Sequence, residues 1–207
     1  MNIQSFLLSV ALEGATWVMW LLAGLSVLGL AVALERALTI WATREGSVRE
    51  LANLLRRGQL QAAARRLEHS PSPEAKVLMA GLEGAADGAG AAEQRMQSAT
   101  QTERVSMERR LVFLGTLGAN APFVGLLGTV IGIIGAFHEL DASGGKVTAG
   151  LLSVVGEALV ATAVGIVVAL PAVAFYNMFL RINKTRLARA DALGRELLAA
   201  LRAREER

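Results

Sequence analysis

An apolar run from position 151 to position 180 constrains this chain more than any other feature. It contains a single ionisable side chain, Glu157. A helix of that length is about 45 Å long, which exceeds the ~30 Å hydrocarbon core of a bilayer. Small residues recur along the run, as is typical of close helix–helix contact in a membrane. A carboxylate inside such a helix is costly, so we expect Glu157 to face a partner, a cavity or an ion path.

Two further apolar runs precede it, so the sequence predicts an all-α membrane protein with three transmembrane helices and long helices that extend into the cytoplasm. The predicted spans are residues 15–41, 111–137 and 151–180. The remaining segments are an N-terminal periplasmic segment (1–14), a cytoplasmic helical region (42–110), a periplasmic loop (138–150) and a cytoplasmic C-terminal helix (181–207). Tryptophans near both ends of the first span favour its placement across a membrane.

The composition excludes several classes of protein and site. Of the 207 residues, 53% are hydrophobic, which is incompatible with a disordered chain or an ordinary soluble domain. The chain has no cysteine and two histidines, His69 and His138, so we expect no disulfide, no metal site and no cofactor.

The distribution of Lys and Arg predicts the orientation. Residues 1–16 contain none and the loop 138–150 contains only Lys146, whereas 42–110 contains eleven and 181–207 contains eight. The positive-inside rule therefore places the two basic segments in the cytoplasm, and the N-terminus and the loop 138–150 on the outer side of the membrane. The basic isoelectric point, about 9.9, follows from this topology, and we expect no nucleic-acid binding.

Short helices are predicted in the cytoplasmic region. Apolar residues at helical spacing predict helices over 48–55 and 60–67. The break Ser70-Pro71-Ser72-Pro73 predicts the start of a third helix over 73–82, and the Gly/Ala-rich residues 84–90 predict a linker. From Ala91 we expect one helix that continues into the membrane without interruption. The arginines of this region can bind anionic lipid headgroups, pack between subunits or simply be solvated.

Two threonines inside the spans are candidates for a proton path. Thr129 lies about 12 Å and Thr162 about 16 Å from the outer ends of their spans, so the hydroxyls share one layer. In the alternative interpretation each hydroxyl bonds a carbonyl of its own helix. Glu157 projects about 140° away from Thr162 around the helix. It is either an ion-path residue or a structural carboxylate at a helix contact or an outer vestibule.

The motifs around these residues resemble a known family. Residues 121–133 read APFVGLLGTVIGI, residues 157–165 read EALVATAVG and residues 169–177 read ALPAVAFYN. They resemble the second-span and third-span signatures of the MotA/TolQ/ExbB proton-channel family. The similarity extends to the three-span topology, the long first cytoplasmic loop and the basic tail. It is closest to the TolQ/ExbB branch, since the flagellar stator branch has four spans.

This resemblance implies a function, partners and site residues. Family members form a pentameric ring around a dimer of a single-span ExbD/TolR-like protein, whose membrane aspartate carries the protons. Thr129 and Thr162 match the pore-facing threonines of the family, and Glu157 joins them as a proton-pathway candidate. The positions expected to pack the spans are Gly125, Gly128, Gly132, Gly165, Pro171 and Asn177. We therefore expect a proton-channel subunit of a motor driven by the proton-motive force. It would energise outer-membrane transport, envelope maintenance or gliding motility, with a further periplasm-spanning partner as an option.

Two other functions are compatible with three spans. The first is a membrane scaffold that holds a complex without conducting protons. The second is an intramembrane enzyme, but Ser153 near the outer end and the loop residue His138 are the only pair available for serine chemistry. The sequence also has no phosphate-binding G-x-x-x-x-G-K-[ST] loop, so we do not expect an enzyme.

Overall fold

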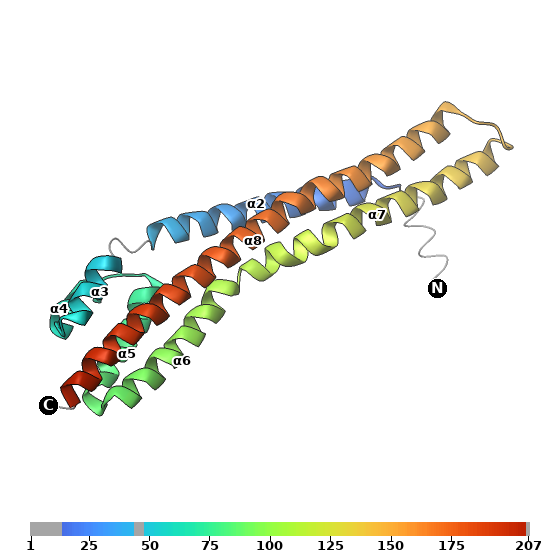
Figure 1. The fold of residues 1–207 in the computed structure, drawn as a ribbon. Coiled ribbons are helices and arrows are strands. Elements are labelled where there is room, and N and C mark those ends of the chain that lie inside the picture. Colours follow the sequence, from blue (N-terminus) through green and yellow to red (C-terminus); the bar gives the residue numbers. More distant parts are fainter. Residues whose placement is uncertain (1–13, 44–47, 206–207) are drawn as a thin grey trace. The chain divides into compact units, whose positions relative to one another are not determined.

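A computed structural model describes residues 14–43 and 48–205, and every regular element in these ranges is a helix. In chain order (Figure 1) these are α2 (Thr16–Ala42), α3 (Val48–Arg56), α4 (Leu60–Leu67), α5 (Pro73–Gly84), the 3₁₀ helix η1 (Ala85–Asp87), α6 (Ala89–Glu108), α7 (Leu111–Ala142) and α8 (Ala149–Glu205). Three of them, α2, α7 and α8, are long and apolar enough to cross a membrane. The prediction of an all-α membrane protein is confirmed.

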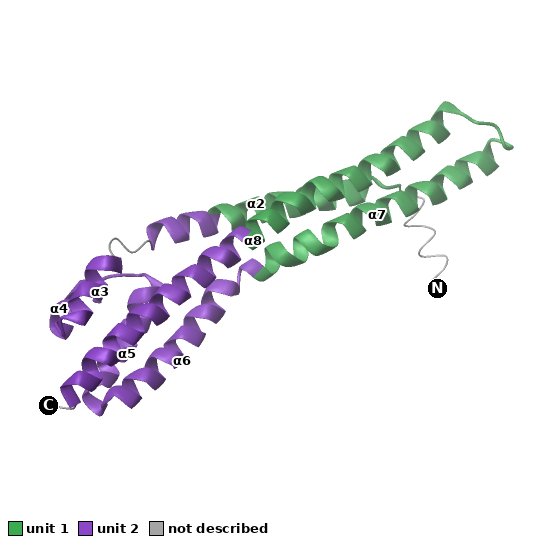
Figure 2. Ribbon diagram, viewed as in Figure 1, with its two compact units in different colours: residues 1–34, 112–177 green, residues 35–111, 178–207 purple. Residues whose placement is uncertain are grey.

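The chain divides into two compact units (Figure 2). Unit 1 comprises residues 1–34 and 112–177, and unit 2 comprises residues 35–111 and 178–207. Of the N-terminal segment expected at 1–14, residues 1–13 lie outside the described part of the chain. The two units are described separately below.

Unit 1 consists of the apolar parts of α2, α7 and α8. Its core is built from small and branched residues, including Val18 and Leu22 of α2, Ala121 of α7 and Ala172 of α8. Many large apolar side chains of the same helices are exposed, as for Trp20 at 75%. Exposed apolar surface on this scale is unfavourable in water and is typical of helices that face lipid or other transmembrane helices.

Unit 2 contains its own hydrophobic core, formed by α3, α4, α5, α6 and the C-terminal half of α8. Leu51, Leu67, Leu78 and Leu197 are almost fully buried in it. Helix α5 begins at Pro73 because the preceding Ser72 accepts a hydrogen bond from the Ala75 N–H at 3.1 Å, as N-cap serines do. The three short helices predicted in this region are present as α3, α4 and α5.

The connections differ from two expectations. The linker expected at 84–90 is mostly helical, since α5 extends to Gly84, η1 follows, and α6 begins at Ala89. Only Gly88, at φ 98°, leaves the helical region, which glycine does at little cost. Toward the periplasmic end predicted for α7, this helix continues to Ala142 and α8 begins at Ala149, so residues 143–148 connect them.

The prediction of an uninterrupted helix from Ala91 into the second span is wrong. Helix α6 ends at Glu108 and α7 begins at Leu111. In a continuous α-helix the Met107 carbonyl would accept the N–H four residues on, at Leu111. Here it accepts the side-chain amide of the buried Asn183, at 3.2 Å. A tertiary hydrogen bond from α8 thus replaces a helical one, which no local signal in residues 107–111 reveals.

Candidate functional site

The α7–α8 contact in unit 1 is made by glycines at positions where no larger residue fits. A Cβ atom on Gly125 would lie 2.7 Å from the Ala161 carbonyl oxygen, and one on Gly165 would lie 2.7 Å from the Ala121 carbonyl oxygen. Both distances are far below van der Waals contact. The backbones of the two helices therefore approach as closely as small-xxx-small motifs allow in membranes.

Two further glycines continue the same contact. A Cβ on Gly128 would lie 2.6 Å from the Ala161 Cβ, and one on Gly132 would lie 2.3 Å from the Ala158 Cβ. Gly128 also faces Val18 of α2, whose Cγ1 would be 3.4 Å away. The alanines and glycines of α8 thus fill the groove of α7 over several turns.

Thr162 forms the polar link within this apolar contact. Its Oγ1 donates a hydrogen bond to the Gly125 carbonyl oxygen at 3.1 Å, and its side chain is half-buried. In an α-helix the same carbonyl also accepts the N–H of Thr129. The Thr162 hydroxyl and the Thr129 N–H therefore share one acceptor, so the two threonines lie within one helical turn of each other along α7.

Thr129 bonds a carbonyl of its own helix, which is the alternative interpretation given in the sequence analysis. Its Oγ1 donates to the Leu126 carbonyl oxygen of its own helix at 2.7 Å. The sequence left both possibilities open for both threonines, and the structure has an interhelical bond for Thr162 and an intrahelical one for Thr129. The donor hydrogen of each hydroxyl is used, while oxygen lone pairs on each side chain can still accept hydrogen bonds.

The other expected site residues lie at different places on α8. Glu157 is exposed on the surface of unit 1 and is not among the residues that contact α7 glycines. Pro171 lies on the wall of a small cavity of about 90 Å³ that also borders Gly29 of α2. Asn177 is exposed at the end of the unit 1 part of α8. The structure therefore brings Thr162 to Gly125 but does not bring Glu157, Pro171 or Asn177 to that point.

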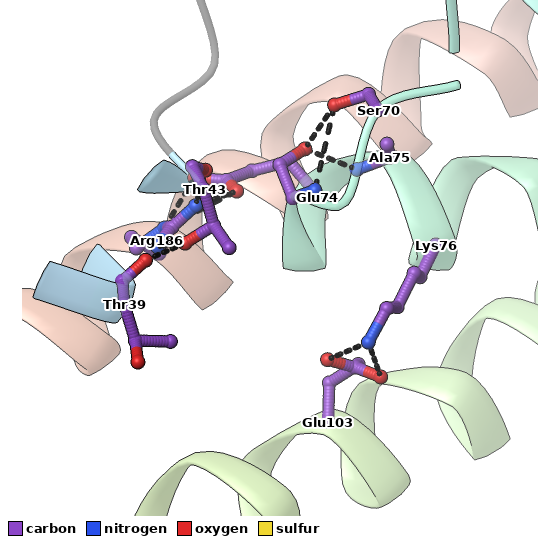
Figure 3. Close-up of polar contacts among 9 residues, drawn as sticks. Thr39, Thr43, Ser70, Glu74, Ala75, Lys76, Glu103 and Arg186 are labelled. Carbon is purple, nitrogen blue, oxygen red and sulfur yellow. Dashed lines mark hydrogen bonds and ion pairs between the residues drawn. The ribbon is translucent and has the colours of Figure 1, made fainter. Parts of the chain in front are cut away.

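Sequence reasoning did not find a buried ion pair in unit 2 (Figure 3). The Arg186 guanidinium donates to both oxygens of Glu74, with Nη2 3.2 Å from Oε2, and to the Thr43 hydroxyl at 2.9 Å and the Thr43 carbonyl. Glu74 is 1% and Arg186 is 7% exposed. The pair joins α8 to α5 and to the residue that follows α2. Glu74 and Arg186 are 112 positions apart, so only the fold could reveal it.

Exposed ion pairs join α8 and α6 to the other helices of unit 2. Lys76 Nζ lies 3.0 Å from Glu103 Oε1 (Figure 3), and Arg56 Nη2 lies 2.7 Å from Glu196 Oε1. The hydrogen bond from Arg56 lowers the pKa of the Glu196 carboxyl, and the same bond raises the pKa of Arg56. The first pair joins α5 to α6, and the second joins the C-terminal part of α8 to α3.

A second charged group lies where the apolar part of α2 ends. Glu35 pairs with Arg110, and Arg36 Nε lies 4.0 Å from Glu35 Oε2. Glu35 thus has a partner from the segment between α6 and α7.

Comparisons with known proteins agree with this architecture. The sequence profile of the MotA/TolQ/ExbB proton channel family matches residues 69–192. The "Biopolymer transport protein ExbB" of Xanthomonas campestris pv. campestris is 39% identical over 105 residues, which is 51% of this chain and 42% of that protein. The "Tol-Pal system protein TolQ" of Pseudomonas aeruginosa is 32% identical over 136 residues, 66% of this chain and 54% of that protein.

A "Putative biopolymer transport protein ExbB-like 2" of Helicobacter pylori is 37% identical over 87 residues, 42% of this chain and 58% of that protein. The matched part thus spans roughly half the length of these relatives. The family profile covers α5, η1, α6, α7 and the part of α8 up to residue 192. The chain therefore belongs to the MotA/TolQ/ExbB proton channel family, within its TolQ/ExbB branch.

Proposed function

We propose that this chain is the ring-forming subunit of an inner-membrane energiser driven by the proton-motive force. In this proposal a homopentamer surrounds a dimer of a single-span ExbD/TolR-like protein that brings an aspartate into the membrane. Family membership supports the general role. The observation that carries the site is the hydrogen bond from the Thr162 hydroxyl to Gly125, inside an otherwise apolar contact one turn from Thr129.

The chain needs a partner because it lacks a proton carrier of its own. Within the predicted spans the ionisable side chains are Glu35 and Arg36 at one end and Glu157 near the other. A threonine hydroxyl can orient a proton through hydrogen bonds but does not titrate near neutral pH. A proton crossing ~30 Å of hydrocarbon therefore requires a carboxylate from a second subunit at the level of the threonines.

The observed hydrogen bonds suggest how the threonines would respond to that carboxylate. Both hydroxyl hydrogens are donated to carbonyls, of Leu126 and Gly125, so each oxygen is free to accept. A protonated carboxyl has an O–H to donate to such an oxygen, whereas an ionised carboxylate only accepts. When the partner's carboxyl ionises, a threonine hydroxyl must therefore rotate away from its carbonyl to donate to the carboxylate, or the carboxylate must leave. Protonation would thus switch the pairing between ring and partner helix.

The energy available from each step limits the mechanism. One elementary charge that moves through 100 mV yields about 2.3 kcal/mol. Several protons per cycle would be needed to drive rotation or displacement of the partner helix against a load. A ring offers the threonine pair once per subunit, which supplies the successive sites that such a cycle requires.

For the process that is powered, the proposal follows the names of the relatives. Biopolymer transport is the first candidate, since the 39% and 37% identical relatives carry that name. The Tol-Pal system is the second candidate, since the TolQ match covers the largest share of this chain among the relatives reported above, 66%. Either process would place the C-terminal helix in the cytoplasm and residues 143–148 in the periplasm, as the positive-inside rule predicts.

The test is proton flux into liposomes that contain a pH-sensitive dye and the chain co-reconstituted with its single-span partner. Replacing both threonines (Thr129→Val and Thr162→Val) should reduce the flux about tenfold or more, because a hydrogen bond to an ionisable group contributes about 1.5–3 kcal/mol. Thr116→Val, which removes an exposed hydroxyl elsewhere on α7, is the matched control and should leave the flux unchanged.

Three outcomes would contradict the proposal. Full flux from the double valine variant in assembled complexes would exclude the threonines from the proton route. Absence of flux from the wild-type complex, with and without the partner, would favour the non-conducting scaffold instead. Physiological flux from the chain alone would show that no external carboxylate is required.

A further inference from the structure

Three arginines surround one cavity at the end of the apolar part of α2. The cavity has a volume of about 420 Å³ and lies wholly within unit 2. Its wall is formed by Glu35, Arg36, Thr39, Ser106, Arg109 and Arg110. One side comes from the last turns of α2 and the other from the end of α6 and the two residues before α7.

The charges in this cavity do not balance. Glu35 supplies one negative charge and pairs with Arg110, which leaves Arg36 and Arg109 as two further positive charges. Thr39 donates its hydroxyl to the Glu35 backbone carbonyl at 2.8 Å and adds no charge to the cavity. The cavity therefore carries a net charge of about +2, a combination that favours an anionic ligand.

Arg36 is the residue that most requires a ligand. Its side chain is 12% exposed, and its Nε is buried yet donates to no acceptor among the described residues. The nearest carboxylate oxygen, Glu35 Oε2, is 4.0 Å away, beyond hydrogen-bond distance. The large majority of buried side-chain donors in folded proteins have a hydrogen-bond partner, so we expect a group outside the described residues to supply an acceptor here.

The position along the chain identifies the class of anion. Glu35 and Arg36 follow the apolar stretch that ends at Leu34, and the exposed Trp41 lies in the next turns. Arginine and tryptophan at the end of a membrane helix are typical of the level of the lipid headgroups. A guanidinium group can donate two parallel hydrogen bonds to two oxygens of one phosphate, which a lysine ammonium cannot do.

We propose that this cavity, which we call the Arg36 pocket, binds the phosphodiester of an anionic phospholipid. Arg36 and Arg109 hold the phosphate oxygens, Ser106 donates its hydroxyl, and the Glu35–Arg110 pair forms the opposite wall. The acyl chains leave the pocket beside the exposed side chain of Leu38 on α2. The site is separate from the threonines of the proposed proton route, and the proposal does not depend on proton conduction.

Binding is tested with the full-length protein, purified in detergent, by native mass spectrometry during titration with dioleoyl phosphatidylglycerol or dioleoyl phosphatidylcholine. The wild-type protein should retain phosphatidylglycerol preferentially. Replacing Arg36 and Arg109 (Arg36→Gln with Arg109→Gln) leaves the close Glu35–Arg110 pair intact. It should weaken phosphatidylglycerol binding about tenfold or more, since charge-assisted hydrogen bonds to the phosphate are lost.

The matched control removes the same charge from exposed arginines of α4 (Arg65→Gln with Arg66→Gln) and should bind as the wild type does. A second test variant, Ser106→Glu, places a carboxylate in the pocket without removing an arginine and should also weaken binding. It guards against misfolding as the cause of the loss, and the melting temperature of each variant checks this directly.

Three results would overturn the proposal. The first is equal phosphatidylglycerol binding by the wild type and by the Arg36/Arg109 variant. The second is an equal loss in the α4 control, which would show a general charge effect. The third is a thermal stabilisation by inorganic phosphate or glycerol phosphate that requires Arg36 and Arg109 while phosphatidylglycerol gives none, which would assign the pocket to a soluble anion. If a carboxylate of a neighbouring subunit occupied the Arg36 pocket in the assembled oligomer, the wild type and the Arg36/Arg109 variant would bind phosphatidylglycerol equally, which is the first of these results.

Discussion

The buried pair between Arg186 and Glu74 gives the sharpest stability prediction. Replacing Arg186 with methionine retains much of the apolar stem but leaves the Glu74 carboxylate, 1% exposed, without its cation. It also removes the donors that the Thr43 hydroxyl and carbonyl accept from. Breaking one partner out of a buried pair costs about 3–5 kcal/mol, because the remaining charge is desolvated without compensation.

The expected change is large enough to measure in detergent. For a chain of this size, 1 kcal/mol of unfolding free energy shifts the melting temperature by about 2–4 °C, so Arg186→Met should lower it by about 6–20 °C. Circular dichroism at 222 nm follows the helices during heating. Unit 2 should lose its helical signal first, since the pair lies wholly within that unit.

The matched control is Arg195→Met, also on α8. Arg195 pairs with Asp191 at 2.9 Å, but the two side chains are 78% and 62% exposed. An exposed pair contributes less than about 1 kcal/mol, so the control should melt close to the wild type. The double replacement Glu74→Met with Arg186→Met should recover much of the loss, because it leaves no unpaired buried charge.

If the Arg186→Met variant melts at the same temperature as the Arg195→Met control, this reasoning is refuted. It would mean that Glu74 is solvated or paired otherwise once Arg186 is lost, so that the buried pair does not hold α5 against α8.

Three further changes test other parts of the structure. Gly132→Ala places a methyl group within 2.3 Å of an α8 side chain and should destabilise the protein by about 1–3 kcal/mol in thermal unfolding, whereas Gly24→Ala, which meets open space, should not. Ser72→Ala removes the α5 cap and should cost about 1 kcal/mol in the same assay; no change would show that the cap is redundant. Because Arg56 lowers the pKa of Glu196, the pair stabilises the fold above the ordinary carboxyl pKa of 4.5 and this contribution is lost as the pH falls through the lowered value. The difference in melting temperature between wild type and Glu196→Gln should therefore be present at pH 7 and vanish in acid, and a difference that persists in acid would contradict the assignment.

The sequence alone determined the class of the protein and most of its helices. Continuous apolar runs of spanning length admit only helices in a membrane, since backbone groups in lipid must bond within their own segment. Helical spacing of leucines found α3 and α4, and the Ser72-Pro73 signal found the start of α5. The family motifs likewise lie in the linear sequence, so the resemblance needed no structure.

Only the tertiary structure decided which partners the polar groups have. The break between α6 and α7 depends on the Asn183 amide, which competes for the Met107 carbonyl from another helix. The Thr162 bond to Gly125 and the Arg186–Glu74 pair also join residues distant in sequence. Periodicity and composition report which face of a helix is apolar, but a hydrogen bond has a range of about 3 Å and depends on how the helices are placed. Polar partners across helices are therefore a property of the fold.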